Sequence, residues 1–137
     1  MKSALGNPTS PEIAQQLLMA HLAGDFEGAA VTVAPTLRLK ALLHTLEISE
    51  VDLPLIEQFK KLVDQRIRSD ARDALQVADF TASLSQLSPD PAARALGART
   101  KAMALHVTSR YQEAVEHYER SRQLYRRAGR EVERARV

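Results

Sequence analysis

The sequence predicts an all-α fold made of paired helices. Alanine and leucine, which both favour helices, supply 21 and 18 of the 137 residues, against 5 glycines and 6 prolines. Apolar residues recur at three- and four-residue spacing, as they do on one face of a helix. The two-residue alternation of a half-buried strand occurs nowhere in the chain. These observations favour helices joined by short turns.

The ends of the predicted helices follow from residues that cap, begin or break a helix. Ser10 is suited to cap the first helix, with Pro11 at its first position. Pro35 is expected to kink or break the second helix, and Gly129 is expected to end the sixth. The fourth helix is apolar on two sides, which predicts cover on two sides. The predicted helices span about 11–23, 26–46, 55–68, 71–87, 92–107 and 111–128.

The chain length predicts a single domain. Residues 1–10 are expected to form an N-terminal tail, and residues 11–137 one helical-repeat domain. Its clearest linker lies between Glu47 and Pro54. The predicted units span 11–47, 55–88 and 92–130, and 131–137 is the expected start of a further helix.

Three segments of the chain superimpose when Ala29, Ala74 and Ala114 are aligned, at spacings of 45 and 40 residues. A small residue at this position lets paired helices approach closely. A break between helices precedes each alanine at a similar distance, at 24–25, 69–70 and 109–110. Since one helix pair cannot bury its own apolar face, stacked neighbours are expected to cover it.

The third segment resembles the tetratricopeptide repeat. Tyr111, Ala114 and Tyr118 stand where that repeat has an aromatic residue, a small packing residue and a second aromatic residue in its second helix. The first helix matches less well, with Lys101 where leucine is typical. The resemblance covers about 95–130 and implies a right-handed α-solenoid, similar to long-repeat bacterial arrays that lie beside signalling or peptidase domains.

The resemblance also implies a binding surface, because the first helix of each repeat lines the concave face of such an array. In the best-matched unit this helix presents Arg99, Met103, His106 and Arg110, at spacings of four, three and four. One methionine among cationic residues suits an acidic peptide or protein. We therefore expect a protein-binding scaffold, as a segment of a larger regulatory protein. An ordinary solvated helix face explains the same residues equally well.

Several classes of function find no support in the residue pattern. The chain has no cysteine, and none of its four histidines lies four residues from another, so no metal site is predicted. No glycine-rich phosphate loop or catalytic pair is visible, so neither an enzyme nor a cofactor is expected. No apolar run is long enough to span a membrane. A cytoplasmic protein is the expectation.

Two alternatives stay open. The first is a nucleic-acid-binding module, because residues 91–137 carry 11 basic and 5 acidic side chains. Against it, Gly129 is expected to interrupt the arginine stripe, and the tyrosines are expected to pack between helices. The second alternative is a small helical bundle that binds a ligand or acts as an enzyme in a deep pocket. The stripe comprises Arg122, Arg126, Arg130 and Arg134, and the tyrosines are Tyr111, Tyr118 and Tyr125.

The C-terminal end suggests self-association. The short segment 131–137 has an apolar side and no residue that stops a helix, so the array is expected to continue in the natural protein. The helix carrying Leu124 and Tyr125 would then present apolar surface that a further unit covers. Weak homo-oligomerisation through this end is expected.

Overall fold

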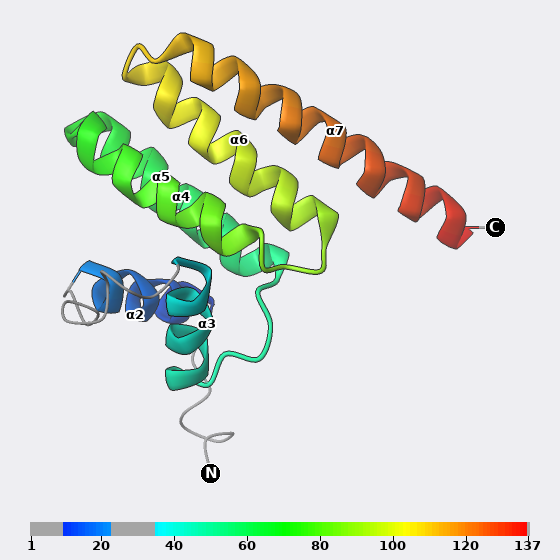
Figure 1. The fold of residues 1–137 in the computed structure, drawn as a ribbon, viewed down its shortest axis with the longest axis horizontal. Coiled ribbons are helices and arrows are strands. Elements are labelled where there is room, and N and C mark those ends of the chain that lie inside the picture. Colours follow the sequence, from blue (N-terminus) through cyan, green and yellow to red (C-terminus); the bar gives the residue numbers. More distant parts are fainter. Residues whose placement is uncertain (1–9, 23–34, 137) are drawn as a thin grey trace. The chain divides into compact units, whose positions relative to one another are not determined.

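The computed structural model describes residues 10–22 and 35–136, and over these residues it contains six helices and no strand (Figure 1). The predicted all-α class is confirmed for this part of the chain. The chain divides into two compact units, residues 1–49 and 50–137. The sequence predicts one domain over 11–137, whereas this division falls inside the predicted linker between Glu47 and Pro54.

The first unit contains α2 (Ser10–Leu22) and α3 (Pro35–Thr45), which contact each other. Leu17 and Leu18 of α2 are buried, as their helical spacing predicts. Pro35 begins α3, where proline's missing N–H costs nothing. The part of the predicted second helix that precedes Pro35 lies outside the described residues, so the expected kink or break there stays a prediction. The predicted break at 24–25 and Ala29 lie outside the described residues.

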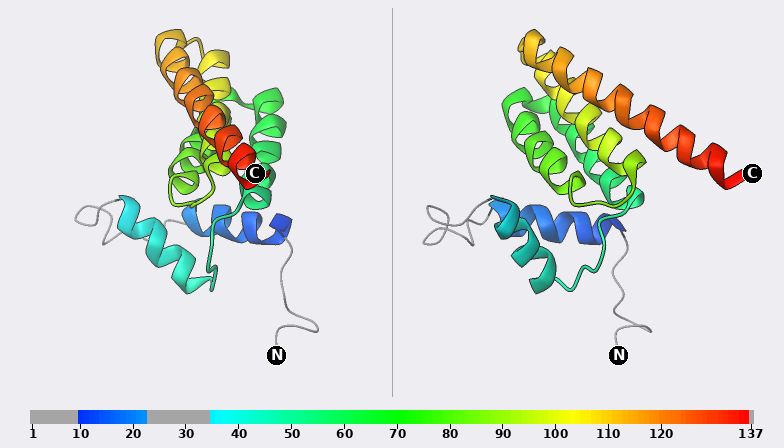
Figure 2. Two further views of the ribbon diagram at one scale, coloured as in Figure 1. Left: turned by 90° about the vertical axis from the view of Figure 1, so that its right-hand side faces the viewer. Right: turned by 45° about the vertical axis from the view of Figure 1, so that its right-hand side comes forward.

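The second unit contains α4 (Leu53–Ser69), α5 (Ala71–Ser85), α6 (Pro91–Val107) and α7 (Tyr111–Arg136). Each of these helices packs against the next, and α4 also contacts α6. Figure 2 shows α6 lying between the α4–α5 pair and α7. Because three helices surround it, α6 is lined with small side chains that are fully buried, among them Ala93, Ala95, Ala102 and Ala104.

Aspartates cap the helices of the second unit. Asp52 accepts a hydrogen bond from the backbone N–H of Leu55 at 3.0 Å, and Asp90 accepts one from Ala92 at 2.9 Å. Asp70 alone separates α4 from α5, and its carboxylate accepts from the backbone N–H groups of the two residues that follow Ala71, at 3.0 and 3.3 Å. These caps satisfy donors that the first helical turn leaves free. The predicted break at 69–70 is confirmed.

The predicted break at 109–110 is also confirmed, and its geometry differs. Ser109 has a φ of 65°, and the backbone N–H of Arg110 donates to the carbonyl of Leu105 at 2.9 Å. This is the six-to-one hydrogen bond by which many helices end. The same arrangement ends α3, where Glu47 has a φ of 58° and the N–H of Ile48 donates to Leu43 at 2.9 Å.

The core of the second unit centres on α5, which is covered on two sides as predicted. Phe80 of α5 meets Phe59 of α4 edge to face, with ring centroids 5.6 Å apart. Ala74 and Ala78 are fully buried. On the side toward α6, a Cβ added at Gly97 would lie 1.9 Å from the Ser85 hydroxyl oxygen. Only glycine at this position therefore permits the observed approach of the two helices.

Gly129 does not end the last helix, and this prediction is wrong. The α7 helix runs without interruption from Tyr111 to Arg136, so residues 131–136 continue it and do not open a seventh helix. Glycine inside a helix costs about 1 kcal/mol relative to alanine, and a long helix of good helix formers can absorb that cost. A Cβ at Gly129 would meet nothing within 4 Å, so no tertiary contact requires a glycine there.

Candidate functional site

The four residues of the predicted binding stripe lie on α6 and the turn that follows it. Arg99, His106 and Arg110 are exposed, and Met103 is half-buried. The expectation that these side chains avoid the core is consistent with the structure. Met103 and His106 line one hollow together, whereas Arg99 and Arg110 do not line it.

This hollow, which we call the α4–α6 groove, is an open depression of about 350 Å³ in the second unit. Two apolar side chains follow one another along the C-terminal turn of α6, Met103 and Val107, and the second is 44% exposed. Side chains from α4 face them, and one tyrosine of α7 completes the wall. The lining residues are Asp64, Ile67, Arg68, Met103, His106, Val107 and Tyr118.

The tyrosines of α7 do not pack between helices, and this prediction is wrong. Tyr111, Tyr118 and Tyr125 are 57%, 39% and 40% exposed. The helix meets α6 through Ala114 and Leu124 and through a buried serine that is discussed below. Because successive residues turn by roughly 100° around a helix, side chains seven apart lie together on a flank beside that contact.

One hydrogen bond fixes the contact between α6 and α7. The Ser121 hydroxyl of α7 is buried and donates to the backbone carbonyl of Ala95 at 2.9 Å. A buried hydroxyl needs such a partner, so this contact sets how α7 is rotated against α6. That rotation leaves Val115 65% exposed. We call Tyr111, Val115, Tyr118 and Tyr125 the tyrosine flank, and Tyr118 joins it to the α4–α6 groove.

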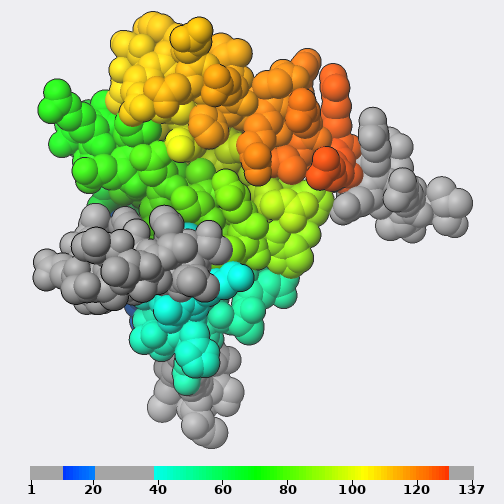
Figure 3. All heavy atoms as spheres, in the orientation of Figure 1, coloured from blue at the N-terminus to red at the C-terminus, as the bar shows by residue number. Residues whose placement is uncertain are grey.

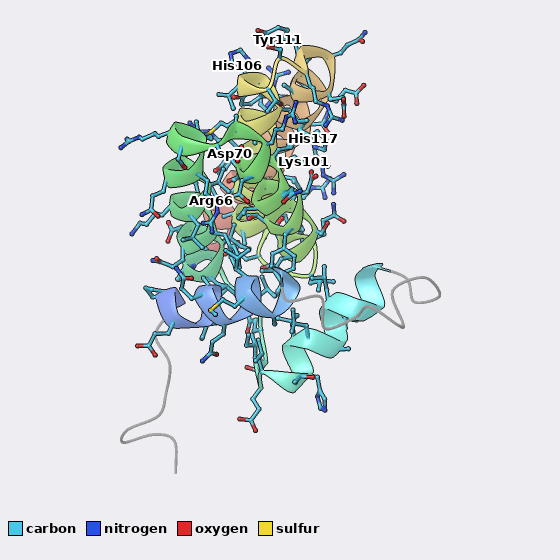
Figure 4. The ribbon with its side chains drawn as sticks, turned by 90° about the vertical axis from the view of Figure 1, so that its left-hand side faces the viewer. Arg66, Asp70, Lys101, His106, Tyr111 and His117 are labelled. Carbon is cyan, nitrogen blue, oxygen red and sulfur yellow. The ribbon has the colours of Figure 1, made fainter. Side chains whose placement is uncertain are left out.

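At one end of the groove, His106 of α6 contacts the first tyrosine of the flank. The two rings of His106 and Tyr111 meet edge to face, with centroids 5.3 Å apart (Figure 4). The contact bridges the turn between α6 and α7. It places an aromatic pair beside the apolar lining of the groove.

The charges around the groove and the flank leave cations unpaired. Three of the acidic groups are engaged: Asp64 pairs with Lys60 at 2.7 Å, Glu113 with Arg110 at 2.8 Å, and Glu119 with Arg122 at 2.7 Å. The Glu119 contact lowers the pKa of that carboxyl through a hydrogen bond from the guanidinium. By contrast, Arg68, Arg99 and Arg126 form no ion pair with any described residue.

Sequence reasoning found two of the seven residues that line the groove. It identified Met103 and His106 from their spacing on α6, but it missed Ile67 and Arg68 because nothing in a single sequence reveals which helix face α4 turns toward α6. It missed Val107 because the residue stood outside the chosen stripe. It assigned Tyr118 to the core from its place in the repeat pattern. The burial of Ser121 is the signal that orients α7, and a serine carries no apolar periodicity.

Other kinds of site are not seen in the part of the chain that the structure describes. No group of three or more His, Asp or Glu side chains there could hold a metal ion. Among the same residues, no helix combines the length and the apolar character needed to cross a membrane. Comparison with known proteins adds no assignment, since no family model, curated protein or solved structure matches this chain.

Proposed function

We propose that the chain is a protein-binding scaffold, and that its second unit holds an amphipathic helix of a partner along the α4–α6 groove and the tyrosine flank. The observation that carries the proposal is the exposed apolar surface that three helices build there. Val107, Tyr111, Val115, Tyr118 and Tyr125 are five of the six large apolar side chains that are exposed in the described residues. Gathered apolar surface of this kind is typical of interaction sites.

The packing within the unit supports a helix as the partner segment. On α5, the positions that correspond to Tyr118 and Tyr125 are Ala78 and Ser85, which are buried, and Ser85 lies against Gly97 of α6. A partner helix could lie against α7 as α6 lies against α5, which is how successive units of a tetratricopeptide-like array would stack. The contacts of α4 with α5 and α6, of α5 with α6, and of α6 with α7 fit such an array.

The charges favour a partner segment with acidic residues beside its apolar ones. Arg68, Arg99 and Arg126 lie near the surface and form no ion pair with any described residue. An acidic helix would complement them, which raises the association rate and selects against basic partners. An apolar side chain of that helix would enter the groove between Ile67 and Met103, where it loses contact with water.

Selection from a random peptide library displayed on phage tests this proposal. We expect the full chain to enrich sequences with acidic residues and apolar residues three and four apart. The variant Met103→Glu, which places a carboxylate in the groove, should lower the affinity of the selected peptides by at least about tenfold. Met19→Glu is the matched control, since Met19 is 67% exposed in the first unit. Equal binding by the two variants would contradict the proposal.

Nucleic-acid binding is the second candidate, because α7 is continuous. The predicted interruption at Gly129 is absent, and Arg120, Arg122, Arg126 and Arg127 are exposed along one helix that also exposes tyrosines. Basic and aromatic side chains together suit single-stranded nucleic acid. This candidate predicts binding of a mixed-sequence RNA oligonucleotide that weakens steeply with salt. Binding of selected acidic peptides without RNA binding would favour the first proposal.

A further inference from the structure

A second hollow lies in the second unit between α5, α6 and α7, and it differs in chemistry from the α4–α6 groove. It is small, about 100 Å³, and none of the residues that line the groove lines it. Figure 3 looks onto the face where these three helices lie side by side. Four of the side chains that line the hollow are basic: Arg94 and Lys101 from α6, and His117 and Arg120 from α7.

The helical spacing explains why these cations converge. Arg94 and Lys101 lie seven residues apart on α6, with Ala98 between them on the same face. His117 and Arg120 lie three apart on α7 and face that row. The small alanine leaves the space that the hollow occupies. Lys101 and His117 lie beside one another in Figure 4.

The acidic groups nearby do not balance this charge. Asp79 of α5 pairs with Lys101 at 3.2 Å, but its side chain is 54% exposed and lies outside the lining of the hollow. Glu116 acts on His117 from the neighbouring position of α7. The Arg94 guanidinium donates to the backbone carbonyl of Ser88 at 2.8 Å. Arg120 forms neither an ion pair nor a hydrogen bond with any described residue.

Cations held together in a partly buried hollow repel one another unless an anion joins them. We propose that this hollow binds a phosphate group, carried either by a small molecule or by a phosphorylated side chain of a protein. Arg120 and Lys101 would supply charge-assisted hydrogen bonds to the phosphate oxygens. Ser83 of α5 and Gln86, which follows the helix, also line the hollow and add neutral donors at its edge. The volume admits one such group and not a whole nucleotide.

The state of His117 supports this assignment. Burial and the positive charge of Lys101 lower the pKa of its imidazole, and Arg120 adds to the effect. The opposing influences of Glu116 and Asp79 are smaller than those of burial and Lys101. A bound phosphate would therefore raise this pKa and give the histidine a measurable response to the ligand.

Titration of the full chain with inorganic phosphate, followed by the NMR signal of the His117 ring, tests the proposal. Ionic strength is held constant with sodium chloride. We expect a saturable shift of His117, a rise of its pKa at saturation, and no such change at His44. Arg120→Gln should weaken binding by about tenfold. Arg126→Gln is the matched control, because this exposed arginine of α7 does not line the hollow.

Each outcome decides the proposal. A shift that does not saturate, or equal weakening by Arg120→Gln and Arg126→Gln, would show general screening and overturn it. If a phosphoserine peptide binds more tightly than inorganic phosphate and its unphosphorylated form does not bind, the source is a phosphorylated side chain. If inorganic phosphate binds as tightly as the peptide, the source is a small molecule. Met103→Glu should leave phosphate binding unchanged, so this test stands apart from that of the groove.

Discussion

Helices α5 and α7 can be aligned residue by residue with an offset of 40 positions. The aligned pairs fall into two sets that differ in burial. At the first set, both members are buried: Ala74 and Ala114, Thr81 and Ser121, Leu84 and Leu124. These positions include the face that each helix turns to its hairpin partner. At the second set only α5 is covered. Ala78 is fully buried, whereas its counterpart Tyr118 is 39% exposed.

The difference shows that neighbours, not the helices themselves, decide what is core in this unit. The helix α5 has α4 on one side and α6 on the other, and its flank toward α6 carries small residues such as Ala78 and Ser85. The helix α7 contacts α6. At the positions of Ala78 and Ser85 it carries Tyr118 and Tyr125. The closed flank is built for close approach, and the open flank presents large apolar side chains that another helix can cover.

Substitutions at the aligned positions 78 and 118 should give the largest difference in the free energy of unfolding. Ala78→Tyr forces a large ring into the closed flank of α5 and should cost about 3 kcal/mol of the free energy of unfolding. Tyr118→Ala removes an exposed ring from α7 and should cost less than about 1 kcal/mol. Urea denaturation followed by circular dichroism measures both. Similar losses for the two variants would mean that neighbouring helices cover the two flanks equally.

The two helical glycines test the same contrast with one substitution. Gly97→Ala places a Cβ against the side chain of Ser85 and should cost about 2 kcal/mol. Gly129→Ala adds a Cβ in open space on α7 and should stabilise the chain by about 0.5–1 kcal/mol. The double variant Gly97→Ala with Ser85→Gly should recover part of the loss. A stable Gly97→Ala variant would show that α5 and α6 can separate at little cost.

How far the sequence predicts this structure depends on the kind of signal each residue gives. The helices of the second unit follow from capping chemistry, since Asp70, Asp90 and the proline after Asp90 act locally. The cover of α5 on both sides follows from its two apolar stripes. The flank exposed by α7 does not follow, because tyrosine suits both a core and a surface. The close contact at Gly97 depends on a residue of another helix, which periodicity within one helix cannot show.

Protonation of His117, which lines the second hollow, should make the stability of the chain depend on pH. Because the pKa of His117 is lowered in the folded chain, the unfolded chain binds this proton more readily. The neutral imidazole therefore makes its full contribution to the free energy of unfolding above the ordinary histidine pKa of about 6.5. This contribution declines as the pH falls below that value. Urea midpoints at about pH 7.5 and about pH 5.5 measure the change.

His117→Gln should reduce that loss of stability on acidification, since glutamine takes up no proton. His44→Gln is the control, because His44 is exposed on α3. The groups that face His117, namely Lys101, Arg120, Asp79 and Glu116, remain in both variants. An unchanged difference between the two pH values in His117→Gln would assign the acid sensitivity to carboxylates elsewhere.

The smallest expected effect is self-association through the open flank of α7. Two copies lying antiparallel about Tyr118 would bring Tyr111 of each helix against Tyr125 of the other. Tyr118 and Tyr125 are only 39% and 40% exposed, so each ring has little further surface to bury and the dimer should be weak.

Light scattering over a range of protein concentrations measures this association, and we expect the apparent mass to rise with concentration. Tyr118→Lys places two like charges at the centre of the antiparallel pair and should return the chain to a monomer. Met19→Lys puts the same charge on an exposed site of the first unit and should change nothing. A peptide selected for the α4–α6 groove should also dissociate the dimer, because Tyr118 belongs to both surfaces. An apparent mass that stays at the monomer value at every concentration would show that the tyrosine flank does not bind a second copy of the chain.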